Sequence, residues 1–209
     1  MSPERVRPDH HAGRPDDADS LPRQLTGRRS PLIWGVVLLV LIEATLLCLW
    51  VVSYLYLRLG LEAWPPPGVA PPDLLPPAIG QILLLLSPLP VWMGLRAVRE
   101  GRVGHFLRLL PLGMFLAVAY LGLKIREYAV KDHHWTIDAY GSLDWSMSGY
   151  AALHVIVVLL AGTVVWALAL GGHVGTRRYT GVEALLIYWL FVALGSLLFF
   201  GVQYLVPIL

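Results

Sequence analysis

The first long apolar segment of the chain carries a single acidic side chain near its middle. This segment runs from Ile33 to Arg58 and reads IWGVVLLVLIEATLLCLWVVSYLYLR. More than twenty mostly apolar residues are about what an α-helix needs to cross the hydrocarbon core of a bilayer. Glu43 lies about 15 Å from the start of such a helix, at ~1.5 Å per residue, and therefore near the bilayer midplane. A charge there costs at least about 2.5–3.5 kcal/mol, so neighbouring helices must supply a polar or protonating environment.

The composition indicates an integral membrane protein. Of its 209 residues, 56% are hydrophobic and only 14% are charged, whereas about a quarter of the residues of a soluble domain are charged. Its one cysteine, Cys48, lies inside the first apolar segment. An intrachain disulfide and a cysteine-based metal site are both excluded.

Five apolar segments have the length of membrane-spanning helices. Residues 1–31 are polar, rich in Pro, Arg and Asp, and have no apolar periodicity, so we predict a disordered cytoplasmic tail there. We predict an all-α fold for residues 32–209: a polytopic membrane protein with a bundle of five transmembrane helices. The predicted spans are residues 33–57, 74–98, 106–128, 148–170 and 182–206. The second span contains Ser87-Pro88-Leu89-Pro90, which should kink it.

The positive charges predict the orientation. Of the 16 Lys and Arg residues, only Arg58, Lys124, Arg126 and Lys131 lie in or beside the loops after spans one and three. The others lie in the tail and in the loops after spans two and four. Because positive charge favours the cytoplasmic side, we expect the N-terminus in the cytoplasm and the C-terminus outside.

Three hydroxyl side chains are predicted at about the depth of Glu43. They belong to Ser87, Thr163 and Ser196, each within about a turn of the expected centre of its span. We hypothesise that some of them donate hydrogen bonds to the Glu43 carboxyl. Alternatively, they are the ordinary small packing residues of membrane helices.

His154 is predicted six residues inside the fourth span, about 9 Å deep. It could bind a metal or haem, pair with a carboxylate, or bond to a backbone carbonyl. Haem binding is the least favoured of these roles, because the other histidines lie in the tail, at interfaces or in loops.

Several polar residues are predicted at the membrane surfaces. Glu127 follows Lys124 by three positions, which suits an ion pair on one helix face. Glu183 begins the last span, where a carboxylate favours the positive helix N-terminus. We predict that Arg58, Tyr54 and Trp64 lie at the membrane interface and contact lipid headgroups.

Read in order, five pieces of the sequence resemble subunit III of the haem–copper oxygen reductases, the cytochrome c oxidase subunit III family. They are IEATLLCLWVVSYLYLR, WPPPGVAPPDLLPP followed by ILLLLSP, LGLKIREYA, GYAALHV and VEALLIYWLFVALG. The likeness runs from about Trp34 to the C-terminus and is to the family's short, five-helix form.

The resemblance implies an accessory subunit without redox chemistry of its own. In the family, haems and copper are held by subunits I and II, while subunit III packs against subunit I, binds phospholipid and supports proton uptake. We therefore expect no cofactor on this chain, no nucleic-acid partner, and a location in a bacterial-type plasma membrane. The residues carried over are Glu43, Arg58, Glu127, His154 and Glu183, with Tyr188 and Trp189 as packing positions.

The chain also departs from the family pattern. Ala151 and Ala152 stand where the family usually has His and Gly, and Leu190 and Ala193 stand where it usually has His and Asp. These changes argue against a polar network joining spans four and five and indicate a divergent branch.

Two other functions are compatible with these residues. One is the related five-helix accessory protein of nitric oxide reductase systems. The other is a small proton-coupled transporter that uses Glu43, although no repeat-related pair of broken helices flanks a site. The electron donor of an oxidase partner, cytochrome c or quinol, is left open.

Overall fold

The computed structural model describes residues 30–69, 73–131 and 133–207. Within these residues the regular structure is helical, apart from one isolated bridge between Gly175 and Arg178. The elements are α2 (Pro31–Gly60), α3 (Leu75–Leu86), α4 (Pro88–Arg99), α5 (Val103–Val130), α6 (Ala139–Leu170), α7 (Thr180–Phe200) and the π-helix η1 (Gly201–Leu205). They form five helical rods long and apolar enough to cross a membrane. The predicted all-α membrane fold is confirmed; the prediction for residues 1–29 lies outside the described residues.

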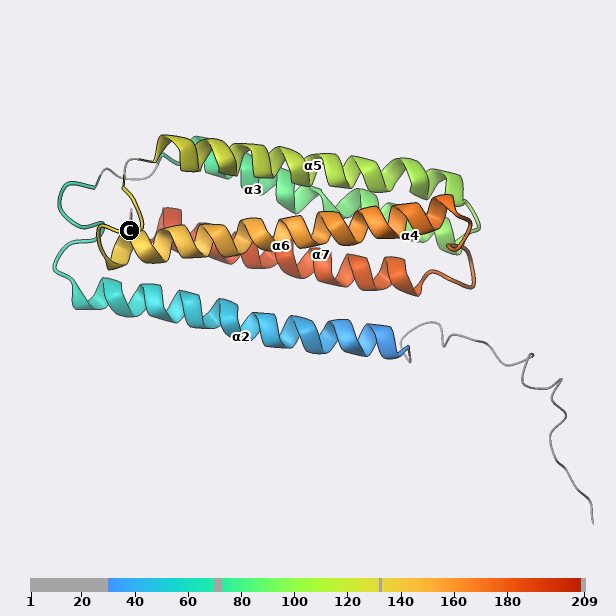
Figure 1. Ribbon diagram of the computed structural model, residues 1–209, viewed down its shortest axis with the longest axis horizontal. Helices are drawn as coiled ribbons and strands as arrows, with labels where there is room; N and C mark the ends of the chain where they lie inside the picture. The colour runs from blue at the N-terminus through green and yellow to red at the C-terminus, as the bar shows by residue number, and fades with distance from the viewer. Residues whose placement is uncertain (1–29, 70–72, 132, 208–209) are drawn as a thin grey trace, which may run out of the picture.

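The rods lie side by side in one elongated bundle, and α2 begins at the end opposite to η1 (Figure 1). We call the end where α2 begins the Pro31 end and the end where α2 finishes the Gly60 end. The helix α5 packs against α3, α4 and α6. The helix α7 packs closely against α2, α3, α4 and α6. The helix α2 packs against α6 and α7 at the edge of the bundle. Only 6% of its most apolar stretch is buried, against 50% for α7 with η1, so α2 is peripheral.

Where the kink was predicted in the second span, the helix is interrupted at one residue, Ser87, between α3 and α4, while the Ser87 backbone keeps helical angles (φ −62°, ψ −32°). Pro88 has no N–H and cannot bond to the carbonyl of Leu84. The Ser87 hydroxyl donates to that carbonyl oxygen (2.7 Å), as does the Ser87 backbone N–H (3.3 Å). In turn Trp189 Nε1 donates to Ser87 Oγ (2.8 Å), which fixes α7 against the break.

The fourth span begins nine residues earlier than predicted, at Ala139 and not at residue 148. Asp138 caps the helix, because its carboxylate accepts from Gly141 N (2.7 Å) and also contacts His133 Nε2 (3.0 Å). Burial alone would raise the pKa of Asp138, but these hydrogen bonds outweigh it and lower that pKa. The loop expected up to Met147 is therefore much shorter, and every residue of α6 lies deeper from the Gly60 end than the sequence indicated.

Two glycines allow α4 and α5 to approach closely. A Cβ at Gly113 would lie 2.7 Å from the Ser87 carbonyl oxygen and 3.0 Å from Val91 Cγ2. A Cβ at Gly94 would lie 2.8 Å from the Phe106 ring. Close backbone approach at small residues is the usual way in which membrane helices gain packing energy.

We predict that Gly113→Ala destabilises the bundle, because the backbone at Ser87 cannot move aside without opening the α3–α4 break. The expected loss is about 1–3 kcal/mol, as for other overpacked sites. Gly122→Ala is the matched control on the same helix, since a Cβ there meets nothing within 4 Å. Thermal unfolding in mild detergent measures both variants, and equal midpoints would contradict the close approach.

Candidate functional site

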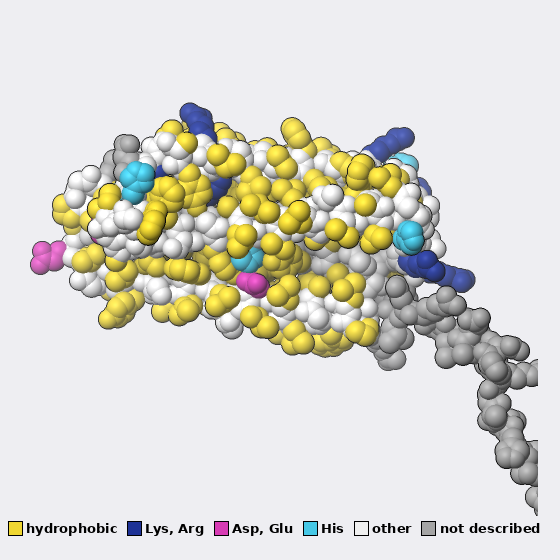
Figure 2. All heavy atoms as spheres, in the orientation of Figure 1, with side chains coloured by type: hydrophobic (Ala, Val, Ile, Leu, Met, Phe, Trp, Pro, Cys, Tyr) yellow, Lys and Arg dark blue, Asp and Glu magenta, His cyan; other side chains and the backbone are white. Residues whose placement is uncertain are grey.

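Glu43 meets two polar side chains of α6 in the middle of the bundle. Tyr150 Oη donates to Glu43 Oε2 (2.7 Å), and His154 Nε2 lies 2.9 Å from the same oxygen. The Glu43 side chain is 20% exposed and that of His154 is 10% exposed. Figure 2 shows an acidic side chain beside a histidine midway along a largely apolar face. The carboxyl is thus bonded to α6 and mostly sheltered.

The second nitrogen of His154 determines how the pair holds its proton. His154 Nδ1 lies 2.7 Å from the backbone oxygen of Tyr150, an atom that can only accept, so Nδ1 carries a hydrogen. Nε2 then either carries a second hydrogen toward a carboxylate or accepts one from a carboxylic acid. In both cases one proton lies between Glu43 and His154, and the net charge of the pair is zero. A neutral pair meets the requirement that the first span imposes at this depth.

The hydroxyls predicted as partners of Glu43 bond elsewhere, so that hypothesis is wrong. Ser87 bonds to Leu84 and Trp189, as described above, and Thr163 donates to the carbonyl of Leu159 on its own helix (2.8 Å). Ser196 Oγ donates to Gln81 Oε1 (2.9 Å). Ser87 and Ser196 are buried and bond to side chains of neighbouring helices, whereas Thr163 is exposed.

His154 does pair with a carboxylate and also bonds to a backbone carbonyl, which were two of the three roles considered for it. Its predicted depth was wrong because α6 starts at Ala139. His154 is fifteen residues from that start, about 22 Å along the helix. Tyr150 was missed altogether, although it lies one turn before His154 and so shares its face of the helix.

At the Gly60 end, Tyr54 is fully buried and not directed to lipid as predicted. Trp64 Nε1 donates to its hydroxyl (2.9 Å), and the Trp64 ring packs edge-on against both Tyr54 and Tyr140. Trp64 therefore closes the end of the α2–α6 contact. Arg58, on the same last turn of α2, is half-buried.

Glu127 belongs to a larger ionic cluster, which we call the Gly60-end cluster. Lys124 Nζ donates to Glu127 Oε2 (2.9 Å), as the spacing predicted, and to Tyr204 Oη (2.9 Å). The Tyr204 hydroxyl donates to the other Glu127 oxygen. Lys131 forms an ion pair with Asp144 of α6.

Gln203 of η1 extends this cluster. Its Nε2 lies 2.8 Å from Asp144 Oδ1 and 2.9 Å from Ser148 Oγ. A polar network does therefore join the fourth and fifth spans, contrary to what Ala151, Leu190 and Ala193 suggested. Ala151 and Ala193 are buried and Leu190 is exposed. The network was not predictable from the sequence because Gln203 and Tyr204 lie in an otherwise apolar C-terminal segment.

Glu183 lies at the opposite, Pro31 end, in the first turn of α7. It forms an ion pair with Arg99, the last residue of α4. Its position at a helix N-terminus agrees with the prediction. The Arg99 side chain is 50% exposed, so this pair contributes little to stability.

We predict that replacing Glu43 lowers the stability of the bundle in proportion to the hydrogen bonds lost. Glu43→Gln keeps the shape and can keep one bond, so the loss should be about 0.5–1 kcal/mol, while Glu43→Ala should lose about 1–3 kcal/mol. Thr163→Val, which removes an exposed hydroxyl bonded within its own helix, is the control and should be neutral. Unfolding midpoints in detergent give the comparison. If both Glu43 variants matched the unmodified chain, the carboxyl would have no effective partner.

A double-mutant cycle tests the shared proton directly. Glu43→Ala and His154→Ala should be strongly non-additive, with a coupling of about 1 kcal/mol or more, because each removal leaves the other group unpaired. Glu43→Ala with Glu183→Ala should be additive, since these carboxylates lie at different depths of the bundle. Additive losses in the first cycle would mean that the two side chains are neighbours without a common proton.

Comparisons with known proteins agree with this architecture. The family model for cytochrome c oxidase subunit III matches residues 25–206. The cytochrome c oxidase subunit 3 of a Synechocystis species is 28% identical over 174 residues, which cover 83% of this chain and 75% of the relative. That of Thermostichus vulcanus is 28% identical over 153 residues, covering 73% of this chain and 76% of the relative. The chain belongs to the cytochrome c oxidase subunit III family.

Proposed function

We propose that this chain is the accessory subunit III of an aerobic haem–copper terminal oxidase, which reduces O2 to water and translocates protons. The observation that carries the proposal is the family match, which extends over all five membrane rods. The two relatives described above are named as cytochrome c oxidase subunits. These names favour an oxidase over a nitric oxide reductase system or an independent transporter.

The subunit takes no part in the redox chemistry itself. His154 lies at the depth where a membrane haem could be held, but both of its nitrogens are engaged, Nδ1 by the Tyr150 carbonyl and Nε2 by Glu43. It has no lone pair free for iron or copper while this pair persists. In this proposal, which follows the family pattern, haems and copper belong to subunits I and II, and subunit I is the main contact of this chain.

The proposed setting is a bacterial-type plasma membrane with the Pro31 end toward the cytoplasm. Exposed Arg96, Arg99, Arg102 and Arg108 lie near the Pro31 end and support this orientation. Half-buried Arg58 and Trp64 mark the opposite interface, where phospholipid headgroups would bind.

We predict that the tagged chain, purified from its native membrane in mild detergent, brings down two larger subunits together with haem. A visible spectrum identifies the haem, and mass spectrometry identifies the chains. Membranes from a strain lacking this chain should keep the same haem bands and initial O2 reduction, because the redox groups lie elsewhere. A colourless, solitary protein would overturn the subunit assignment, and loss of the haem bands on deletion would overturn the accessory role.

A further inference from the structure

The Gly60-end cluster faces a second polar group that lies deeper in the bundle. Ser196 Oγ donates its one hydrogen to Gln81 Oε1 (2.9 Å). Tyr120 Oη lies 3.3 Å from Ser196 Oγ and must therefore be the donor in that contact. All three side chains are buried. Tyr120 is one helical turn before Lys124, so this group begins where the Gly60-end cluster stops.

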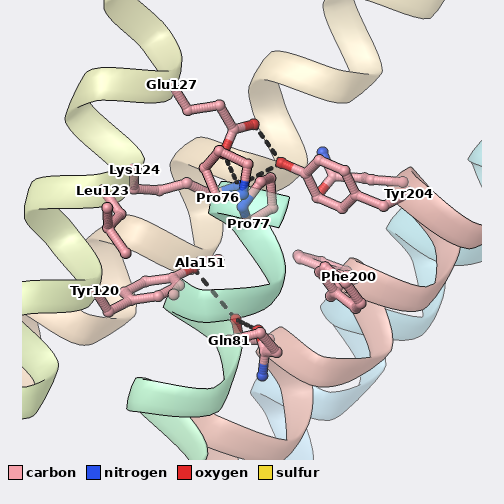
Figure 3. Close-up of a pocket in the computed structure, with 14 residues that line it drawn as sticks. Pro76, Pro77, Gln81, Tyr120, Leu123, Lys124, Glu127, Ala151, Phe200 and Tyr204 are labelled. Carbon is pink, nitrogen blue, oxygen red and sulfur yellow. Dashed lines mark hydrogen bonds and ion pairs between the residues drawn. The ribbon is translucent and has the colours of Figure 1, made fainter. Parts of the chain in front are cut away.

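A cavity of about 20 Å³ lies between the two groups. Figure 3 shows Lys124, Glu127 and Tyr204 at one end of it, Gln81 at the other, and Tyr120 between them. Gln203 and Ser196 also line it. One water molecule needs roughly 10–15 Å³ and two to four polar partners, and this cavity offers both.

Unused hydrogen-bonding capacity also borders this space. The Lys124 ammonium has three hydrogens, of which Glu127 and Tyr204 take two. Gln203 uses its nitrogen toward Asp144 and Ser148, and its Oε1 has no partner among the described residues. Among the described residues, Thr180 Oγ1 is the only side-chain nitrogen or oxygen atom that is both fully buried and without a hydrogen-bond partner. Because Gln203 Oε1 also has no partner there, it must be partly exposed. It therefore borders one of the two cavities that Gln203 lines.

We propose that the cavity binds one ordered water molecule. The water accepts from Lys124 Nζ and donates to the oxygens of Gln203 and Tyr120. It thereby joins the Gly60-end cluster to the Tyr120–Ser196–Gln81 group. The result is a continuous hydrogen-bonded file from Lys131, the residue that caps the end of α5, to Tyr120, eleven residues earlier and so about 16 Å away along the helix axis.

The outer end of this file is open to a larger cavity of about 500 Å³ at the Gly60 end, lined in part by Glu127, Lys131, Asp144 and Gln203. The inner end of the file is Ser196. Ser196 and His154 both line a second cavity of about 10 Å³, together with Tyr150, Ala151 and Phe199. That volume is at the lower limit for one water molecule. The hydrogens of Ser196 Oγ, Tyr150 Oη and His154 Nδ1 are already donated elsewhere. The proposed water file therefore ends at Ser196, before the Glu43–His154 pair.

The test is a cryo-electron microscopy map of the complex that contains the full chain, at a resolution that shows other buried waters. We expect a density peak within hydrogen-bonding distance of Lys124 Nζ and Gln203 Oε1. A map without a peak, or with density for a larger molecule, would overturn the proposal.

A methyl group placed in the cavity provides a second readout. A Cβ at Gly80 would lie 3.4 Å from Tyr120 Cδ2 and 3.6 Å from Leu123 Cδ1, which are ordinary contacts with cavity-lining residues. Gly80→Ala should lose the peak and unfold at a midpoint about 2–4 °C lower, because the polar groups lose their water. Gly122→Ala, with open space at its Cβ, should keep the peak and the midpoint. A Gly80→Ala variant as stable as Gly122→Ala would show that the cavity is dry.

Discussion

The structure depends on a carboxyl–imidazole pair, Glu43 with His154, whose net charge is zero in the middle of a membrane. A lone carboxylate at this depth would be costly, and a hydroxyl partner alone would leave its charge in place. His154 resolves the conflict because its Nδ1 hydrogen is committed to the Tyr150 carbonyl. The imidazole and the carboxyl can then satisfy each other only by sharing one proton. Tyr150 completes the bonding of the same oxygen from the preceding turn of α6.

This pair also explains how α2 is positioned despite its small buried area. Glu43, Leu47 and Tyr54 recur at helical spacing and form one stripe along α2. Glu43 bonds to α6, whereas Leu47 fits against Gly195 of α7, where a Cβ would come within 2.6 Å of its side chain. Apolar contacts alone specify register poorly in lipid, because lipid tails are equally apolar. The polar contact therefore determines the register, and the Leu47–Gly195 contact determines how closely the helix approaches.

The sequence predicted which segments form membrane helices better than it predicted which side of each helix packs against the others. Apolar length predicted the five spans, and Pro88 predicted an irregularity in the second span, since these signals are local. The partner of Glu43 was not predictable in the same way, because α2 is apolar all around and its stripe is hidden. The polar segment before Met147 was predicted as a loop, but it forms the first turns of α6, so His154 was placed too near the membrane surface. Once Asp138 is recognised as the cap, His154 moves to the depth of Glu43.

The two polar centres of the chain obey the same electrostatic rule at different depths. Near the Gly60 end, Lys124 and Lys131 are matched by Glu127 and Asp144, so full charges persist there as compensated pairs. At mid-membrane, where ion pairs cost more, Glu43 and His154 share one proton and their net charge is zero. Ser196 and His154 line one cavity of about 10 Å³ between the two centres, which is too small to hold a chain of water molecules. Each centre is therefore neutral in itself, and neither needs a charge from the other or from a partner chain.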